Sequence, residues 1–135
     1  MRLLIDTNIL LEIILAQEKA REAQSLLSRT EEHVFFISDY CLHSIGVLLF
    51  RRRRHKTFWE IIEDLIFNAG MLVVSLSIKE MESVVRVAQR FRLDFDDAYQ
   101  YVAAKKYQLT LVSFDTDFDR TERGRQTPVA IMGTG

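Results

Sequence analysis

The chain has 135 residues, of which 48% are hydrophobic and 27% charged, and these values are typical of a folded globular domain rather than a disordered segment. Five glycines and one proline are too few for a collagen-like or low-complexity sequence. The 18 basic and 19 acidic residues give a formal net charge of -1, which excludes a global field that would attract nucleic acid or a membrane surface. We therefore expect a single domain over 1–135 that meets any polyanion through a local patch.

Five short apolar runs, taken in chain order, have the length of buried strands rather than helices. They cover 3–5, 34–37, 71–74, 109–112 and 129–131. The stretches between them carry apolar residues at helical spacing, with charged residues on the opposite face. Because consecutive strands separated by helices pair in parallel, this pattern predicts an α/β fold with three α/β/α layers and a central five-stranded parallel sheet.

The sequence carries no pattern typical of secretion or membrane insertion. Asp6 and Glu12 interrupt the first apolar stretch, unlike the core of a signal peptide. No apolar run approaches the roughly 18 residues needed to cross a bilayer. The single cysteine, Cys41, has no disulfide partner in the chain and is expected to be buried. We expect a cytoplasmic protein with no membrane contact.

Acidic residues directly follow two of the predicted strands. Asp6 comes after the first strand, and Asp115 and Asp117 come after the fourth. Taken alone, each acid could be a helix N-cap or part of a solvated turn. The alternating acids do not match a calcium-binding EF-hand loop, which requires a glycine where this chain has Arg120 and a glutamate where it has Gln126.

A third acidic group, formed by Asp94, Asp96 and Asp97, opens a predicted late helix, where Asp94 could act as the cap. Since the carboxyl ends of parallel strands share one edge of a sheet, Asp6, Asp97 and Asp115 should converge and repel one another. A cation would relieve this repulsion, and oxygen ligands without His or Cys select Mg²⁺ or Mn²⁺. Such ions activate water against phosphodiesters, so the pattern predicts a metal-dependent nuclease.

These fragments resemble the PIN domain family of small metal-dependent ribonucleases, which includes the VapC-type toxins of toxin–antitoxin pairs. The resemblance covers nearly the whole chain and rests on Leu-Leu-Ile-Asp-Thr-Asn at 3–8, Phe-Asp-Asp-Ala at 95–98 and Leu-Val-Ser-Phe-Asp-Thr-Asp-Phe at 111–118. It implies an endoribonuclease dependent on Mg²⁺ or Mn²⁺, with RNA as its substrate, an antitoxin as a partner and a homodimer as its assembly. It also implies that Asp6, Asp97 and Asp115 bind metal and act in catalysis, that Asp117 is an auxiliary acid, and that Asn8, Ser44, Asp96 and Ser113 are candidate polar supports.

One position departs from the family pattern. The family usually has a glutamate six residues after the serine that follows the second strand, and here Ser38 leads to Ser44. Asp39 and His43 are not obvious substitutes, and Glu12 could compensate only if its helix turned inward. This departure leaves a second hypothesis open, in which the chain is a catalytically degenerate PIN-fold module that binds RNA or a protein.

The run Arg51-Arg52-Arg53-Arg54-His55-Lys56 is the only dense positive patch in the sequence. Its simplest explanation is favourable charge at a helix C-terminus. The alternative is a phosphate-contacting strip for RNA, because lysine and arginine clusters supply most non-specific affinity for nucleic acid. The acidic tail of an antitoxin could use the same surface. The candidate contacts are Arg51, Arg52, Arg53, Arg54 and Lys56.

Two further features bear on function. The heavily apolar stretch over 58–66 is expected in the core or at a dimer interface rather than as a base-stacking platform. A phosphatase with Asp6 as its nucleophile is a weaker alternative, because such enzymes resembling the haloacid dehalogenases normally have a second Asp where this chain has Asn8. P-loop, dinucleotide-binding and serine-nucleophile motifs are absent from the sequence.

Overall fold

Four parallel strands form the central sheet of the computed structural model, which describes residues 1–133. Their order is β3-β2-β1-β4, so the first strand lies in the interior of the sheet. Leu4 of β1 lies opposite Phe36 of β2 and Leu111 of β4. The strands are β1 (Arg2–Ile5), β2 (Val34–Ser38), β3 (Leu72–Val74) and β4 (Thr110–Val112).

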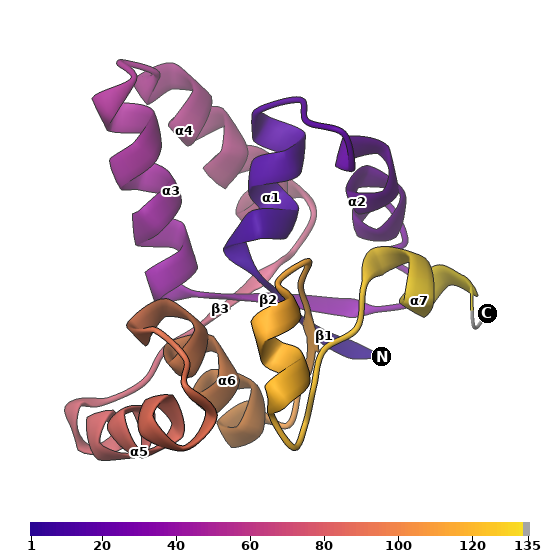
Figure 1. The fold of residues 1–135 in the computed structure, drawn as a ribbon. Coiled ribbons are helices and arrows are strands. Elements are labelled where there is room, and N and C mark those ends of the chain that lie inside the picture. Colours follow the sequence, from indigo (N-terminus) through magenta and orange to yellow (C-terminus); the bar gives the residue numbers. More distant parts are fainter. Residues whose placement is uncertain (134–135) are drawn as a thin grey trace.

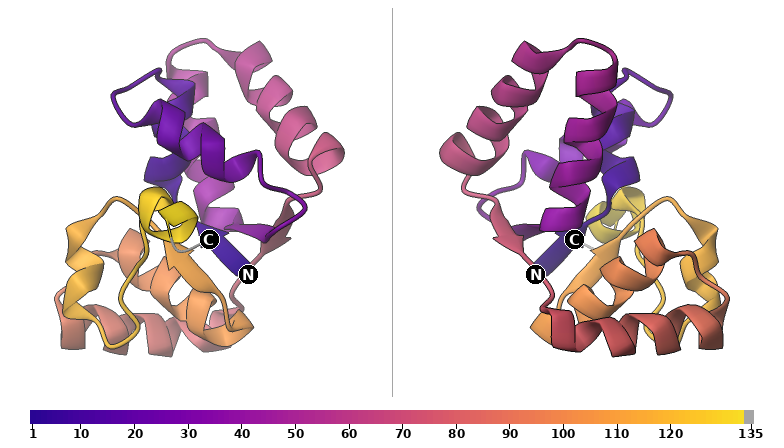
Figure 2. Two further views of the ribbon diagram at one scale, coloured as in Figure 1. Left: turned by 90° about the vertical axis from the view of Figure 1, so that its right-hand side faces the viewer. Right: turned by 90° about the vertical axis from the view of Figure 1, so that its left-hand side faces the viewer.

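Helices cover both faces of this sheet, which confirms the predicted three-layer architecture. Figure 1 shows α1 to α4 and α7 on one face and α5 and α6 on the other, and the side views in Figure 2 agree. Within residues 1–133, no helix combines the length and hydropathy that a bilayer crossing requires. The α-helices are α1 (Thr7–Ile14), α2 (Ala20–Leu27), α3 (Asp39–Arg51), α4 (His55–Ile62), α5 (Met81–Phe91), α6 (Phe95–Tyr107) and α7 (Pro128–Gly133), and the short helices are η1 (Glu63–Asn68), η2 (Ile78–Glu80) and η3 (Thr116–Arg120).

Alternate side chains of β1 are buried in opposite helical layers. Leu3 and Ile5 pack in the core beneath α1, α2 and α3, where Cys41 is also buried as expected. Leu4 packs on the other face with Phe118 and residues of α6. Because helices cover both faces of the parallel sheet, the strand is a continuous apolar run rather than an alternating one.

The predicted fifth strand over 129–131 is wrong, because these residues belong to α7. Thr127 Oγ1 accepts a hydrogen bond from Ala130 N at 3.1 Å, and Pro128 takes the first helical position, where its missing N–H costs nothing. Within residues 1–133, only an isolated bridge between Val112 and Gln126 extends the sheet beyond β4. A three-residue apolar run does not distinguish a strand from a helical turn, and here the cap favours the helix.

The order of the strands places a switch point between β1 and β4, where folds of this kind form a crevice for ligands. From β1 the chain runs outward through β2 to β3 and then returns to the other side of β1 as β4. At such a reversal the connections after two neighbouring strands leave in opposite directions, which opens a binding site at their carboxyl ends. Asp6 directly follows β1 and Ser113 directly follows β4, so both residues lie at this crevice.

Candidate active site

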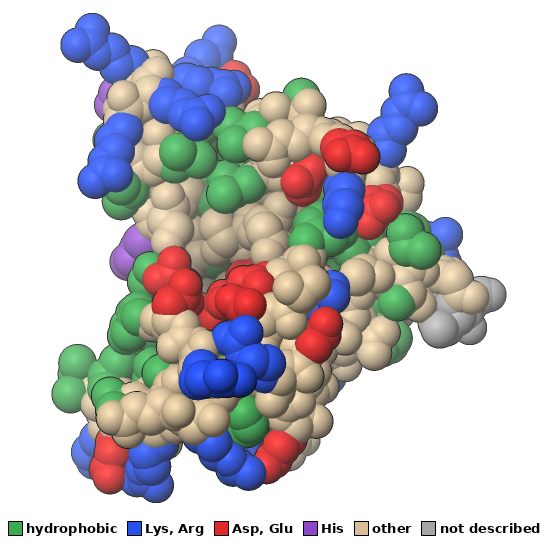
Figure 3. Space-filling view, in the orientation of Figure 1, with side chains coloured by type: hydrophobic (Ala, Val, Ile, Leu, Met, Phe, Trp, Pro, Cys, Tyr) green, Lys and Arg blue, Asp and Glu red, His purple; other side chains and the backbone are tan. Residues whose placement is uncertain are grey.

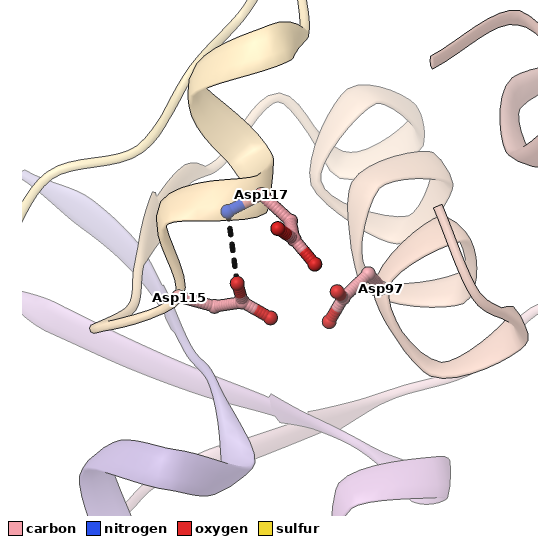
Figure 4. Close-up of side chains that lie close together, drawn as sticks. All are labelled: Asp97, Asp115 and Asp117. Atoms are coloured by element: carbon pink, nitrogen blue, oxygen red, sulfur yellow. Dashed lines mark hydrogen bonds between the residues drawn. The ribbon is translucent and has the colours of Figure 1, made fainter. Parts of the chain in front are cut away.

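Three of the acids predicted from the sequence lie together at the carboxyl edge of the sheet. Asp97, Asp115 and Asp117 each offer a carboxylate oxygen, and these three oxygens lie within 4.8 Å of one another. Figure 4 shows Asp97 extending from α6 toward Asp115 and Asp117, which belong to the segment after β4. Asp97 is buried and the other two are half-buried. We call these three residues the acid cluster.

Helix caps fix the two segments that carry the acid cluster. Asp94 accepts a hydrogen bond from Asp97 N at 3.0 Å where α6 begins. Asp115 accepts one from Asp117 N at 2.8 Å where η3 begins. The capping explanation is therefore correct for Asp94 and Asp115, and Asp6 likewise caps α1. It does not exclude cation binding by Asp115, because a carboxylate that caps through one oxygen keeps the other for a second partner.

Asp6 lies beside the acid cluster and is held by four hydrogen bonds. Its Oδ1 accepts from Thr7 N at 2.8 Å and from Gln100 Nε2 at 3.0 Å. Its Oδ2 accepts from Ser113 Oγ at 2.6 Å and from Asn8 Nδ2 at 3.3 Å. Burial raises the pKa of Asp6, while the hydrogen bonds from Ser113 and Gln100 act in the opposite direction. These four donors fix the carboxylate in one orientation.

Asn8 and Ser113 connect the ends of β1 and β4 across the crevice. Asn8 Nδ2 donates to Ser113 Oγ at 3.1 Å, and Phe114 N donates to Asn8 Oδ1 at 3.1 Å. Ser113 Oγ also accepts a bond from Asp115 N at 3.0 Å. Through these contacts the segment that carries Asp115 is held against the segment that carries Asp6.

The negative charge of Asp97 is unfavourable in these surroundings. Burial raises the pKa of Asp97 to about 8, with further contributions from its hydrogen bond with Asp115 and from neighbouring carboxylates. Arg120 Nη1 lies 3.0 Å from Asp117 Oδ1, and this ion pair offsets part of the negative charge of the acid cluster. A divalent cation would offset the rest, because a nearby positive charge favours the ionised carboxylate. This all-oxygen donor set fits Mg²⁺ or Mn²⁺.

A cavity of about 330 Å³ adjoins Asp97 between α1, α3 and α6, and we call it the α3–α6 cavity. Tyr40 and Ser44 line it from α3, and Asp96 and Gln100 line it from α6. Ser44, which takes the place of the usual glutamate, therefore faces the same space as the predicted acids. The serine hydroxyl brings no charge to this space.

The three side chains considered as substitutes for that glutamate lie elsewhere. Glu12 accepts a backbone N–H in the connection from α1 to α2, at 2.9 Å. Asp39 accepts a hydrogen bond from Tyr99 Oη at 2.7 Å. His43 lines a separate apolar cavity formed by α3 and α4. None of the three lines the α3–α6 cavity.

Sequence reasoning missed two polar side chains of this cavity, Tyr40 and Gln100. Gln100 is 1% exposed and interrupts the otherwise apolar buried run of α6, and this interruption was the signal that could have identified it. Tyr40 precedes Ser44 by one helical turn, and its Oη donates to Asp96 Oδ1 at 2.5 Å. No pattern in the sequence links positions 40 and 96.

The basic run lies apart from the acid cluster, at the turn between α3 and α4. Residues 51–56 are all exposed there. Figure 3 shows Lys and Arg side chains over this turn and a group of acids near the middle of the molecule. Lys56 pairs with Glu60 at 3.9 Å, whereas no carboxylate within residues 1–133 pairs with any of Arg51–Arg54. The structure therefore separates two fields of opposite sign.

The apolar stretch over 58–66 lies against the core, but none of its residues is fully buried. Phe58, Leu65 and Ile66 contact the core cluster that includes β1 and α3. Trp59 remains 55% exposed, so part of this surface is open to a partner.

The PIN domain family model matches residues 3–124 of this chain, a range that contains Asp6 and the whole acid cluster. A comparison with curated proteins found no match.

Several solved structures share this fold. VapC20 from Mycobacterium tuberculosis, a Sarcin-Ricin loop cleaving toxin, aligns with a TM-score of 0.72 and 19% identity, covering 93% of this chain and 99% of that chain. A toxin-antitoxin complex from Klebsiella pneumoniae aligns with a TM-score of 0.67 and 22% identity, covering 93% and 96%. VapBC2 from Rickettsia felis, bound to a DNA fragment from their promoter, aligns with a TM-score of 0.69 and 16% identity, with the same coverage. At these identities the likeness establishes a shared fold.

Proposed function

The chain belongs to the PIN domain family, and we propose that it is a metal-dependent endoribonuclease that acts as the toxin of a toxin–antitoxin pair. The observation that carries this proposal is the acid cluster, which lies at the crevice between β1 and β4 and gathers three carboxylate oxygens within 4.8 Å. A cation would relieve the concentration of negative charge in this partly buried site, and the crevice is where a substrate can reach it.

In this proposal Asp97 and Asp115 hold the cation, with Asp6 beside them and Asp117 as an auxiliary acid. Mg²⁺ or Mn²⁺ would supply an activated water to attack the phosphorus and would stabilise the oxygen that leaves when the P–O bond breaks. The fold holds the carboxylate oxygens of these acids in fixed positions, which lowers the entropic cost of assembling the cation site. Arg120 restrains Asp117 through its 3.0 Å ion pair.

The proposed substrate and partners follow from the comparisons and from the surface. The Mycobacterium tuberculosis relative is described as a Sarcin-Ricin loop cleaving toxin, which supports RNA as the substrate class. The Klebsiella pneumoniae structure is a toxin-antitoxin complex, which supports an antitoxin partner here. The exposed run Arg51–Arg54 with Lys56 would contact RNA phosphates or the acidic tail of that antitoxin. We also propose a homodimer in the cytoplasm.

RNA cleavage by the purified protein in Mn²⁺ tests this function. We expect cleavage that is lost with a chelator, and a loss of at least about 100-fold in Asp97→Asn, because one ligand and its charge are removed. Asp64→Asn, which removes an exposed carboxylate outside the site, is the matched control and should retain full activity. Cleavage that persists in chelator or in Asp97→Asn would overturn the assignment.

The second candidate is a degenerate PIN-fold module that binds RNA or a protein without cleaving. Ser44 is the observation that favours it, because this residue lines the α3–α6 cavity without a carboxylate. The same assay separates the two candidates when it is combined with RNA retention on the immobilised protein. Retention without cleavage in Mn²⁺ or Mg²⁺ would establish the binding module.

A further inference from the structure

The α3–α6 cavity has walls of mixed chemistry. The side chains of Leu11 and Leu48 make part of its lining apolar, and Tyr40 adds an aromatic ring. Ser44 adds a hydroxyl, and three aspartates, Asp97 among them, add carboxylates. The volume of about 330 Å³ falls within the roughly 300–1,000 Å³ that is typical of sites for small ligands. Such walls suit a flat, largely apolar ring that carries a few hydrogen-bonding groups.

The charge of the lining disfavours a phosphate group inside the cavity. Asp6, Asp96 and Asp97 line it, and within residues 1–133 no lysine or arginine does so. An anion would be repelled by these carboxylates unless a cation lay beside it, and the proposed cation belongs to the acid cluster. The part of a nucleotide that suits the cavity is therefore its uncharged base.

Asp97 connects the cavity to the acid cluster, because it belongs to both. A single ribose joins a nucleotide's base to its phosphate. A phosphate bound to a cation at the acid cluster would therefore bring its base to the mouth of the cavity. In single-stranded RNA the bases can turn away from their neighbours and pack on aromatic side chains of a protein.

The aromatic ring of the cavity is already held in place. The centroid of the Tyr40 ring lies 5.6 Å from that of Phe95 and 5.6 Å from that of Tyr99. Tyr40 Oη also donates to Asp96 Oδ1 at 2.5 Å. A side chain held in this way loses little conformational entropy when a ligand packs against it. Asp96 keeps Oδ2 as an acceptor for an N–H group on the edge of a base.

We propose that the α3–α6 cavity binds an unpaired RNA base whose phosphate lies at the acid cluster. This inference rests on the proposed function, because it places another part of the same substrate. Ser44 makes room for the base, since a glutamate at this position would bring a longer and charged side chain to the cavity. The serine thus replaces an acid by space for the substrate.

Binding of mononucleotides to the Mn²⁺-loaded protein tests the proposal without measuring cleavage. The probes are the four nucleoside 5′-monophosphates and ribose 5-phosphate, which has the sugar and the phosphate but no base. We expect at least one nucleotide to bind about 10-fold more tightly than ribose 5-phosphate, because packing of a base on an aromatic side chain contributes about that factor. Calorimetric titration measures both affinities.

Two variants of the cavity should remove this preference. Ser44→Phe fills the space, and the preferred nucleotide should then bind no more tightly than ribose 5-phosphate. Tyr40→Ala removes the ring instead and should weaken the preferred nucleotide by about 10-fold. Neither variant should change the affinity for ribose 5-phosphate, which also shows that the protein is folded. Val47→Phe is the matched control, because it adds the same ring to α3 at an exposed position that lines a separate cavity.

The outcomes separate this inference from the function on which it rests. If the nucleotides bind no more tightly than ribose 5-phosphate, or if Ser44→Phe and Tyr40→Ala both keep the preference, the base site is overturned and the metal centre stands. If neither the nucleotides nor ribose 5-phosphate show binding that depends on Mn²⁺, the proposed metal centre is wrong, and the base site is overturned with it.

Discussion

Asp97 couples the stability of the protein to its site chemistry. The pKa of Asp97 is raised to about 8 in the folded protein, above its ordinary value of 3.8. Below pH 4 the carboxyl is protonated in both the folded and unfolded states. As the pH rises from about 4 to about 8, the unfolded chain loses this proton while the folded protein retains it. The free energy of unfolding of the metal-free protein should therefore fall across this range.

Asp97→Asn should remove this loss of stability. In chelator at pH 8 we expect the variant to melt at least about 4 °C above the unmodified protein, which corresponds to roughly 1 kcal/mol for a domain of this size. At pH 4 the two melting temperatures should converge. Thermal unfolding followed by circular dichroism between pH 4 and 8 measures this, with Asp64→Asn as the control for the loss of one charge. If the melting temperatures of the unmodified protein and Asp97→Asn changed with pH in the same way, the prediction would be contradicted.

The sequence could identify the acids but not all of their contacts. The positions of Asp6, Asp97 and Asp115 relative to predicted elements indicated one edge of the sheet, because parallel strands end together. The hydrogen bond from Gln100 to Asp6 depends on how α6 packs against the end of β1, and the hydrogen bond from Tyr40 to Asp96 depends on how α3 and α6 pack. The two residues are 94 positions apart in the first pair and 56 in the second. Spacing within one element carries no information about such contacts.

At the scale of the helices, polar caps determine where the chain turns from strand to helix. Ser38 ends β2 and caps α3, because its Oγ accepts a hydrogen bond from Cys41 N at 3.0 Å. In the segment over 129–131 the apolar run suggested a strand, but Thr127 and Pro128 begin a helix there. In this segment the cap and the proline, and not the apolar run, agree with the structure.

Ser38→Ala should destabilise the protein by about 1–2 kcal/mol, because the substitution leaves the buried N–H of Cys41 without an acceptor. Urea unfolding at constant pH measures the change in stability. Ser25→Ala, on the exposed face of α2, is the matched control and should change stability by less than about 0.5 kcal/mol. Equal effects of the two substitutions would show that the cap is not important.

Across the whole molecule, a net charge of -1 conceals two separated fields. The acid cluster lies at the carboxyl edge of the sheet, while the basic run lies at the α3–α4 turn. Figure 3 shows acidic side chains near the middle of the molecule and Lys and Arg side chains at its upper left. Under the proposed function, an RNA strand bound at both places would meet the arginines at one and the proposed cation at the other. Composition alone could not reveal this division, because it depends on where the elements place each charge.

The salt dependence of RNA binding tests the basic field. Each phosphate contact contributes about 0.7 to the slope of log affinity against log salt for a single strand, so Arg52→Gln with Arg53→Gln should reduce that slope by about 1.4. Binding of a single-stranded RNA is measured in chelator, where the strand stays intact. The paired substitution Arg21→Gln with Lys79→Gln removes two exposed charges elsewhere and should leave the slope unchanged. If both pairs change the slope equally, binding follows net charge, and if neither changes it, RNA does not use this strip.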